Sequence, residues 1–381
     1  MYRVVLVHPN AGVNWQGNAE NFTVELARHL DKYFAVELLS GADCGSFCHP
    51  IKSVSRSQVV NWKFYPSINR LLHRWFSNPE IAIEHLTSFI PCINYLLQNP
   101  ADLIVTHNGY GGLLMASCVR AIIGTPILFA EHNNSFKQGE YLKRIMELKP
   151  DCFIVPNPTA AKYVKDLAPD RSLKIIPHGI DTTEFSPLGE AKIVGLLKPV
   201  ILCVAPLERD GNSRIELAIE AVSRLPRASL LICGEGSDRD YFQALGERLL
   251  GKARFQIKTF AYAQMPQVYR SADVFTLPSI EAFQGLAYLE AMACGLPVVA
   301  TDDSVRRYLI GGAGITCDVT DIDVYAKSLQ TALERHWFAE KPEQNAQRFS
   351  WHEVALLHHK TILQTIHQKN HNYRFPTTQN F

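Results

Sequence analysis

The chain repeats one pattern twice: short apolar runs of strand length alternate with amphipathic segments of helical period. In the first half the apolar runs lie at 4–7, 103–106, 126–130 and 152–156, and the helical segments at 20–30, 113–122 and 159–167. In the second half the apolar runs lie at 200–205, 229–233 and 274–277, and the helical segments at 215–225, 238–250 and 286–294. Strands and helices that alternate in this way form a parallel sheet covered by helices. The chain is therefore predicted to be an α/β protein with two doubly wound domains.

A segment with Pro and Gly at 185–190 separates the two halves, because these residues interrupt helices and strands. We therefore predict a first domain over 1–187 and a second domain over 188–350. A helical period returns over 351–369, and the polar residues 370–381, which have no period, are expected to form a loose tail. The length of 381 residues agrees with two domains, since one hydrophobic core rarely grows beyond about 250–300 residues.

Charge and hydropathy exclude several classes of protein. The chain has 38 Lys and Arg against 37 Asp and Glu, so no global field would attract nucleic acid. No apolar stretch approaches the roughly 20 residues that a membrane span needs. The first apolar run meets Asn10 too early for a signal peptide. These features predict a cytoplasmic protein that does not bind nucleic acid.

The nine cysteines indicate neither a disulfide framework nor a metal site. Cys203 and Cys233 lie inside apolar strand-like runs, where cysteine behaves as a small buried hydrophobe, so a reducing cytosol fits best. Cys44, Cys48 and His49 are close enough to suggest a metal, but no second pair of ligands follows. We therefore interpret Cys44 and Cys48 as loop cysteines and predict no metal ion.

The segment 278–301 carries the strongest functional pattern. A strand ends at Pro278, a loop carries the carboxylate of Glu281, Gly285 opens a helix, and Glu290 lies inside that helix. Glycine lets a ligand approach backbone N–H groups, whose partial positive charge suits a diphosphate. The segment resembles the signature of the family 4 glycosyltransferases, retaining enzymes of the GT-B fold, which is P-S-x-x-E-x-F-G followed by E-A-M-A-x-G-x-P-V.

The resemblance implies two facing Rossmann-like domains with a central cleft, and transfer of a sugar from a nucleotide-sugar donor. Residues 290–298 match the second half of the signature position by position. In that family the carboxylate that matches Glu290 binds the ribose hydroxyls, and the earlier one, here Glu281, contacts the donor sugar. Glu281 and Phe283 each lie one place nearer the N-terminus than in the family pattern, and Ala282 occupies the usual glutamate position. The other donor contacts that the resemblance implies in this segment are Phe283, Gly285 and Leu286.

Two matches in the first half extend the resemblance. Residues 16–20 are similar to the family's G-G-A-E turn, which assigns Gly17 to the donor and Asn18 to the acceptor side. A simple strand-to-helix turn explains these residues equally well. The residues around His132 are similar to a T-x-H-N element by which some family members bring a histidine to the donor sugar, the alternative being a histidine that caps a strand. His107 also ends a strand and is the weaker candidate, placed on the acceptor side, because ligands lie outside the carboxyl ends of parallel strands.

Three further matches lie at the domain crossing and in the second half. Residues 175–187 resemble I-P-N-G-V-D-x-x-x-F-x-P, the family's crossing between domains. His178 stands there where Asn is common, and acceptor-side lining and a structural histidine are equally good readings. Gly234 and Gly236 resemble the G-x-G turn of the second domain, and Tyr262 precedes a segment similar to y-x-x-A-D-v. The resemblance implies that these residues frame the nucleotide base.

The charge of a leaving nucleoside diphosphate must be stabilised. Family members use an Arg and a Lys five residues apart after the first strand of the second domain. Here Arg209 and Arg214 keep this spacing but begin a few places later, and no Lys is present. Both arginines are assigned to the donor phosphates, solvated loop arginines being the alternative. No metal and no other cofactor are expected in this interpretation, and the residues assigned to catalysis are His132, Glu281 and Arg214.

One stretch bears on a membrane. Apolar residues within 68–76 follow a helical period, with Arg70, His73 and Arg74 opposite. Such a helix could touch lipid headgroups, but core packing explains the same period and is favoured. A peripheral contact with a membrane therefore stays open.

The expected partners are a nucleotide-sugar donor and a glycan or small-molecule acceptor, and the oligomeric state is left open. Residues 349–351 resemble an F-S-W segment after which the last helix of family members packs back on the first domain. A sugar-nucleotide epimerase of similar build is the first alternative. A non-catalytic subunit is the second, because Glu281 is shifted and the phosphate-binding Lys is missing.

Overall fold

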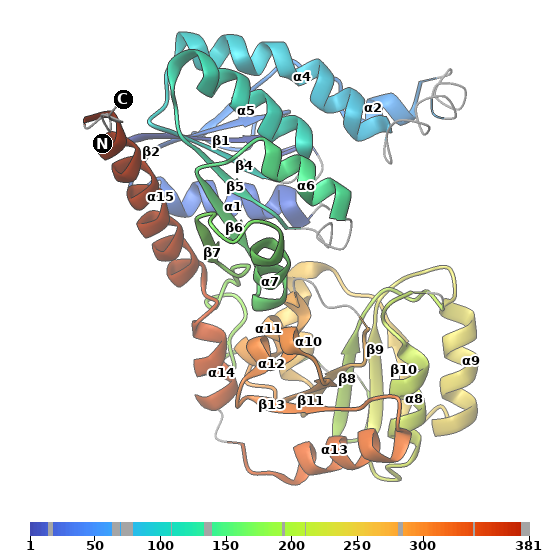
Figure 1. Cartoon of the computed structure of the whole chain (residues 1–381). Coiled ribbons are helices and arrows are strands. Elements are labelled where there is room, and N and C mark those ends of the chain that lie inside the picture. Colours follow the sequence, from blue (N-terminus) through green and yellow to red (C-terminus); the bar gives the residue numbers. More distant parts are fainter. Residues whose placement is uncertain are drawn as a thin grey trace. The chain divides into compact units, whose positions relative to one another are not determined.

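The computed structural model describes residues 1–13, 18–62, 69, 79–107, 109–132, 139–192, 195–209, 211–280, 285–337 and 340–374. The chain divides into two compact units, Met1–Pro177 with Val354–Phe381, and His178–Glu353 (Figure 1). The sequence predicted the boundary at residue 187, but the structure divides the chain after Pro177. The residues from 178 to 187 belong to the second unit because they contact it. The amide of Ile180 donates to the carbonyl of Phe349 at 2.8 Å, and Phe185 is buried in the core of the second unit.

The first unit is a seven-stranded sheet in the order β3-β2-β1-β4-β5-β6-β7. Its strands are β1 (Arg3–His8), β2 (Ala35–Ser40), β3 (Cys48–Pro50), β4 (Leu103–His107), β5 (Ile127–Ala130), β6 (Cys152–Val155) and β7 (Leu173–Ile175). Its helices are α1 (Asn18–Leu30), α2 (Arg56–Val60), α4 (Pro79–Gln98), α5 (Tyr110–Ile123), α6 (Gly139–Glu147) and α7 (Pro158–Leu167).

The second unit is a six-stranded sheet in the order β10-β9-β8-β11-β12-β13. Its strands are β8 (Val200–Val204), β9 (Ser229–Cys233), β10 (Phe255–Lys258), β11 (Val274–Leu277), β12 (Val298–Thr301) and β13 (Gly314–Cys317). Its helices are α8 (Ile215–Ser223), α9 (Arg239–Leu250), α10 (Met265–Arg270), α11 (Leu286–Ala293), α12 (Ser304–Ile310), α13 (Ile322–Glu334) and α14 (Glu340–Gln347), with a short 3₁₀ helix η2 (Tyr262–Gln264) before α10.

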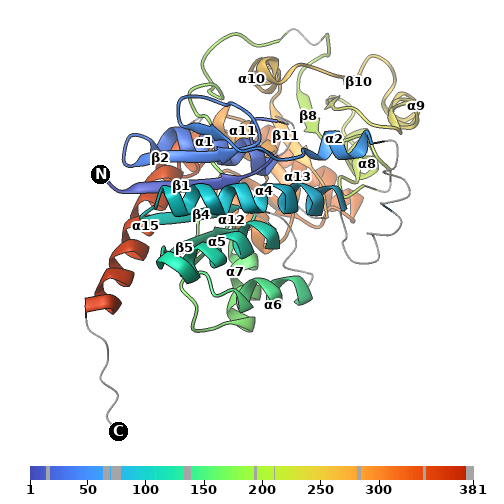
Figure 2. The same ribbon diagram turned by 90° about the horizontal axis from the view of Figure 1, so that it is seen from above.

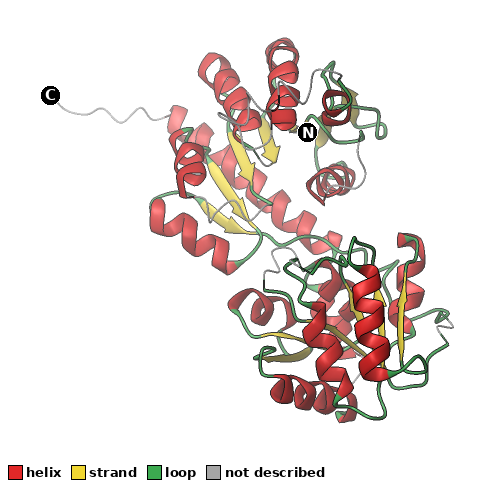
Figure 3. Ribbon diagram, turned by 90° about the vertical axis from the view of Figure 1, so that its right-hand side faces the viewer, coloured by secondary structure: helices red, strands yellow, loops and turns green. Residues whose placement is uncertain are grey.

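Both sheets are parallel and are covered on both faces, which explains why their central strands are continuous apolar runs. Successive residues of β8 point to opposite faces: Val200 and Leu202 join the core under α10 and α11, whereas Ile201 and Cys203 join the core under α8, α9 and α13. Helices flank the second sheet on both sides in Figure 3. The predicted α/β class with two doubly wound units is confirmed.

The strand order reverses once in each sheet. In the first unit the chain moves outward from β1 to β3 and resumes on the other side of β1 with β4. In the second unit it moves from β8 to β10 and resumes beside β8 with β11. In open parallel sheets ligands bind outside the carboxyl ends of the two strands at such a reversal. The loops after β8 and β11 are therefore expected to form a ligand-binding site.

The last helix, α15 (Trp351–Arg374), belongs to the first unit from Val354 onward. The imidazole of His359 stacks on the ring of Tyr33, with the two ring centroids 4.5 Å apart. The ring centroids of His358 and of Phe22 in α1 are 5.9 Å apart. Near the other end, the hydroxyl of Tyr2 and Nε2 of His367 are 3.2 Å apart. α15 lies beside α1 in Figure 2, so residues distant in sequence complete the first unit.

Cys44 and Cys48, which the sequence indicated to be loop cysteines, form a disulfide, and Cys48 begins β3. β3 pairs with β2, and the turn that joins them brings the two Cα atoms to 5.6 Å, within the range that a disulfide requires. The argument for a reducing compartment therefore fails for this pair. The free cysteines are Cys92, Cys118, Cys152, Cys203, Cys233, Cys294 and Cys317.

Of the helices that the structure describes, none is long and apolar enough to cross a membrane.

Candidate functional site

The two loops at the reversal in the second unit are joined by hydrogen bonds. The amide of Ile280, after β11, donates to the carbonyl of Asn212, after β8, at 2.8 Å. The guanidinium Nε of Arg214 donates to the carbonyl of Pro278 at 2.8 Å, and its second nitrogen lies 3.4 Å from the hydroxyl of Thr301. Two motifs that are about 70 residues apart therefore meet at the carboxyl edge of the sheet.

Helix α11 begins at this edge. Gly285 precedes it in the left-handed region, with φ of 65°, and a Cβ there would lie 2.4 Å from Cδ1 of Leu309. Both the backbone conformation and the space therefore require glycine. The amides of Tyr288 and Leu289 are the first to bond the carbonyl of Gly285, so the amide of Leu286 precedes the intrahelical hydrogen bonds. Such an amide at a helix N-terminus can receive an anion.

Glu290 lies on α11 and is 7% exposed. One carboxylate oxygen accepts a hydrogen bond from the hydroxyl of Tyr269 at 2.7 Å, and the other from the hydroxyl of Tyr262 at 3.0 Å. Tyr269 is fully buried, whereas Tyr262 is 62% exposed. Burial raises the pKa of Glu290, and the two tyrosine hydrogen bonds only partly oppose it. Since each carboxylate oxygen has two lone pairs, the side held by Tyr262 can still accept ligand hydroxyls.

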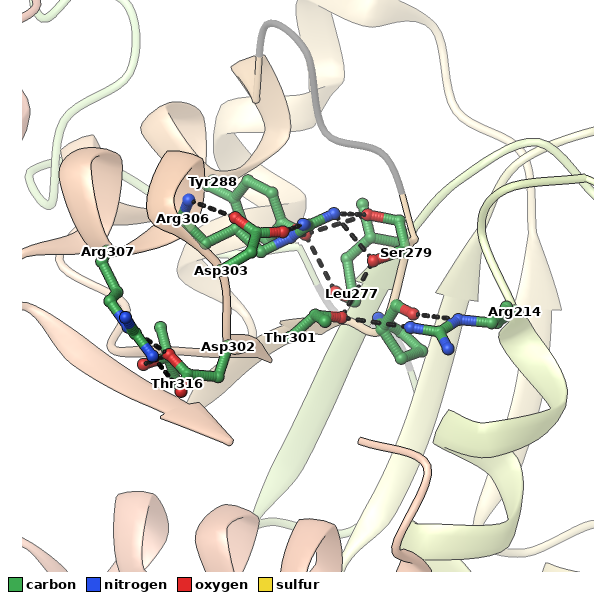
Figure 4. Close-up of polar contacts among 11 residues, drawn as sticks. Arg214, Leu277, Ser279, Tyr288, Thr301, Asp302, Asp303, Arg306, Arg307 and Thr316 are labelled. Carbon is green, nitrogen blue, oxygen red and sulfur yellow. Dashed lines mark hydrogen bonds and ion pairs between the residues drawn. The ribbon is translucent and has the colours of Figure 1, made fainter. Parts of the chain in front are cut away.

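The two candidate arginines turn in different directions. Arg214 has φ of 50° and ψ of 46°, and its side chain reaches the loop after β11 and the last residue of β12 (Figure 4). Burial and the charge of Arg306 lower its pKa. Arg209 instead stacks on the ring of Tyr241 of α9 at 4.1 Å, and its amide donates to Asp238 at 2.9 Å. Among the described residues, Arg214 therefore contacts Pro278 in the segment that leads to α11, whereas Arg209 contacts Tyr241 and Asp238 of the neighbouring loop and helix.

Gly234 and Gly236 have a packing reason to be glycine. A Cβ at Gly234 would lie 1.9 Å from the carbonyl oxygen of Ala205, and one at Gly236 would lie 2.3 Å from that of Leu207. The loops after β8 and β9 run side by side here, with the amide of Leu207 bonded to the carbonyl of Glu235 at 2.9 Å. This close approach explains the G-x-G turn without a ligand.

In the first unit, the two histidines that the sequence treated separately form a pair. His107 ends β4 and His132 follows β5, and Nδ1 of His107 lies 2.8 Å from Nε2 of His132. Both imidazoles are buried, and the ring of Phe22 of α1 lies 4.3 Å from that of His132. In a hydrogen bond between two imidazoles one nitrogen donates and the other accepts, so each histidine sets the tautomer of its partner.

A buried polar network at the start of α1 has no counterpart in the sequence analysis. Glu20 accepts from the guanidinium of Arg56 and from the amide nitrogen of Asn10, both at 3.1 Å. Arg56 also donates to Glu84 at 2.9 Å. Burial lowers the pKa of His8 to about 4, and the charge of Arg56 adds to this effect. Glu20 is the last residue of the segment 16–20 that is similar to the family's G-G-A-E turn. That similarity was the feature of the sequence that could have indicated this network.

Some predicted site residues fall outside the described part of the chain. These are Gly17, Glu281 and Phe283, together with Arg70, His73 and Arg74 of the stretch considered for a membrane. The side chain of Asn18, the first residue of α1, also lies outside it. His178 is buried and is the first residue of the second unit. The indole of Trp351 packs against the neighbouring Gly179, where a Cβ would lie 2.4 Å from the indole.

No group of three or more His, Cys, Asp or Glu within the described ranges is arranged to hold a metal ion. Of the residues predicted to contact the donor diphosphate, Arg214 bonds the carbonyl of Pro278 after β11, and Gly285 and Leu286 lie at the start of α11. The sequence reasoning missed Arg306, which is fully buried beside them. It also missed Tyr269 as a partner of Glu290, although Tyr269 lies in the segment that matched y-x-x-A-D-v.

Comparisons with known proteins agree with this geometry. Residues 194–349 match the family model described as glycosyl transferases group 1, and residues 19–184 match glycosyltransferase family 4. The chain is 31% identical over 195 residues to a GDP-mannose-dependent alpha-(1-6)-phosphatidylinositol monomannoside mannosyltransferase from Mycolicibacterium smegmatis, with 46% of this chain aligned. The chain spans half the length of that relative.

Solved structures share the fold at low identity. Sucrose-phosphate synthase from Thermosynechococcus elongatus has a TM-score of 0.75 at 17% identity, with 97% of this chain and 100% of the other covered. HepE from Anabaena in complex with UDP has a TM-score of 0.68 at 18% identity, with 96% and 100% covered. The GT-B fold that the sequence resemblance implied, with two Rossmann-like domains, is confirmed.

Proposed function

We propose that this chain, which belongs to the group 1 glycosyltransferases of family 4, transfers a sugar from a nucleoside diphosphate donor to an acceptor hydroxyl with retention of configuration. The acceptor is a glycan, a lipid-linked sugar or a small molecule. The proposal of a nucleotide-sugar donor is supported by two similar proteins, a GDP-mannose-dependent mannosyltransferase and a protein solved in complex with UDP.

The observation that carries the proposal is the arrangement around α11. Glu290 has one carboxylate oxygen on the side of the exposed Tyr262, suited to a pair of ribose hydroxyls. Gly285 and the first amides of α11 provide partial positive charge for the diphosphate, and Arg214 adds a full charge at the same edge of the sheet. Ribose and diphosphate are adjacent in every nucleoside diphosphate sugar, so these features fit one ligand.

In the proposed reaction the bond between the anomeric carbon and the leaving diphosphate breaks, and a bond to the acceptor oxygen forms on the same face. The leaving phosphate takes the proton of the acceptor hydroxyl. Arg214 and the N-terminus of α11 stabilise the negative charge that develops on the phosphate. The family resemblance assigns Glu281 and His132 to the donor sugar, and Asn18, His107 and His178 to the acceptor. These assignments are part of the proposal.

Turnover should persist in excess EDTA, because Arg214 and the first turn of α11 answer the diphosphate charge. The check is the initial rate of nucleoside diphosphate release with and without chelator, using the same enzyme stock. Loss of turnover on chelation, followed by recovery with manganese or magnesium, would contradict this expectation.

The proposed function is tested by thermal-shift measurements with nucleotide sugars that differ in base and sugar, followed by product analysis. A bound donor should raise the free energy of unfolding by about 2.7 kcal/mol at 100 times its dissociation constant. A donor that stabilises the protein should then lose its sugar to an added acceptor, with the anomeric configuration kept in the product by NMR. Conversion of the donor without an acceptor would indicate an epimerase, and binding without turnover would indicate a non-catalytic subunit.

A further inference from the structure

The carboxylate of Glu290 is shared by two tyrosine hydroxyls whose surroundings differ. Its Oε2 accepts from Tyr269 at 2.7 Å, and its Oε1 accepts from Tyr262 at 3.0 Å. Tyr269 is fully buried, and its ring centroid lies 6.0 Å from that of Phe185 and 5.9 Å from that of Phe275. Tyr269 is therefore part of the hydrophobic core, and it fixes the side of the carboxylate that faces the core.

Tyr262 holds the other carboxylate oxygen from the surface. It is the first residue of the short helix η2 and is 62% exposed, although its hydroxyl lies against the buried carboxylate. Burial and the charge of Glu290 raise the pKa of Tyr262, so its hydroxyl stays protonated and donates. Exposed side chains change rotamer rapidly. Tyr262 can therefore leave Glu290 at the cost of one hydrogen bond, which water replaces.

The number of lone pairs on the open side of Glu290 limits what can bind there. Each carboxylate oxygen has two lone pairs. Tyr262 uses one lone pair of Oε1, so one remains on that oxygen. A ribose presents two neighbouring hydroxyls. The first fits the remaining lone pair, and the second needs the lone pair that the hydroxyl of Tyr262 uses.

We propose that the hydroxyl of Tyr262 and one hydroxyl of the nucleotide ribose compete for the same position on Glu290. The inference rests on the proposed function, because it takes Glu290 as the anchor of the ribose. A phenol and a sugar hydroxyl each donate one hydrogen bond, so either satisfies the carboxylate oxygen. Every nucleotide with a complete ribose must then break the hydrogen bond between Tyr262 and Glu290 in order to bind.

This competition has a consequence for turnover. The nucleoside diphosphate product of the proposed reaction keeps the ribose and the diphosphate of the donor, so the same groups bind it. It must leave before the next donor binds, and product release limits the rate of many enzymes. The hydroxyl of Tyr262 lowers the affinity for this product, because it returns to Glu290 when the ribose leaves.

The test compares Tyr262→Phe with Tyr163→Phe. Phenylalanine keeps the aromatic ring and removes only the hydroxyl. Tyr163 of α7 is the matched control, because it is 41% exposed and lies in the first unit. Calorimetry gives the dissociation constants of the wild type and both variants for uridine, guanosine and adenosine diphosphate. The 2′-deoxy and 3′-deoxy forms of the nucleotide that binds best are then measured in the same way.

We expect Tyr262→Phe to bind the ribonucleoside diphosphate about 3–10-fold more tightly than the wild type, because one hydrogen bond no longer has to be broken. Each deoxy form presents a single hydroxyl, which the remaining lone pair of Oε1 accepts beside Tyr262. Its affinity should therefore change by less than about twofold. Tyr163→Phe should match the wild type with every nucleotide. A purely structural tyrosine does not give this pattern, because its loss weakens binding of all the ligands.

Equal or weaker binding of the ribonucleoside diphosphate by Tyr262→Phe would overturn the proposal. A gain of the same size with the deoxy forms would also overturn it, because the competing group would then not be a ribose hydroxyl. In both cases the proposed function stands as long as the wild type binds a nucleoside diphosphate. If none of the three nucleoside diphosphates binds to the wild type or to Tyr262→Phe, the proposed function fails and this inference fails with it.

Discussion

At the scale of the residue, Glu290 should hold the ribose of the donor. Its carboxylate accepts hydrogen bonds from the buried Tyr269 and from the exposed Tyr262. Loss of a charged acceptor should weaken nucleoside diphosphate binding by about 1.5–3 kcal/mol in Glu290→Ala. Calorimetry on the folded variant checks this, with Glu220→Ala, an exposed glutamate of α8, as the control. An affinity equal to that of the wild type would remove the assignment.

Backbone atoms of a neighbouring loop occupy the space that a side chain at Gly234 would need. In Gly234→Ala the new Cβ would meet the carbonyl oxygen of Ala205, so the ends of β8 and β9 must move apart. We expect a loss of about 1–3 kcal/mol in the free energy of unfolding, the usual cost of overpacking. Gly312→Ala is the control, because nothing lies within 4 Å of a Cβ there. Urea unfolding of both variants decides the point, and equal stabilities would show that the two loops separate easily.

At the scale of the element, the segment between β11 and α11 carries a glutamate that departs from the family pattern. Pro278 and Gly285 keep the family spacing, while Glu281 is shifted by one place between them. Glu281 itself lies outside the described residues, and we predict that its carboxylate points to the first amides of α11. A carboxylate at that place is favoured by the unpaired amides of a helix N-terminus.

Glu281→Ala should therefore abolish transfer while the thermal unfolding midpoint stays near that of the wild type, and Ala282→Glu should not restore activity in that background. Steady-state rates and a melting curve of the three proteins provide the check. Recovery of transfer in the double variant would show that position 282, and not 281, faces the donor.

At the scale of the whole molecule, the first unit should lose stability in mild acid. Burial lowers the pKa of His8, His85 and His358 to about 4, below the ordinary value of 6.5. Between these pH values the unfolded chain binds more protons than the folded one, so stability falls as the pH falls, by about 1.4 kcal/mol per pH unit for each histidine. The lowered pKa of Glu20 acts in the same direction at lower pH, and the raised pKa of Glu84 acts in the opposite one.

The measurement is urea unfolding of the first unit between pH 7 and pH 5, followed by a tryptophan-independent probe such as far-UV circular dichroism. His358→Leu removes one of the three titrating groups and should reduce the slope by about a third. A stability that is flat over this pH range would show that these histidines are protonated without unfolding the unit.

Features that depend on residues close together in the chain could be predicted from the sequence. The apolar period predicted the central strands β1, β4, β8, β9 and β11, because a strand buried on both faces must be apolar throughout. It did not predict β10 and β13, which lie at the edges of the second sheet and are only partly buried. The signature segment located Gly285 and Glu290, because a glycine at a helix start and a carboxylate one turn later are adjacent in the chain.

Contacts between side chains that are distant in the chain depend on the fold and could not be predicted from the sequence. Arg306 bonds Ser279 across 27 residues, and Tyr269 bonds Glu290 across 21. His107 and His132 form a pair because β4 and β5 are neighbours in the sheet. The guanidinium of Arg209 stacks on the ring of Tyr241 in α9. These contacts depend on where the sheet order reverses and on which helices cover its edge. That order is set by the packing of the whole unit, so no local spacing in the sequence carries it.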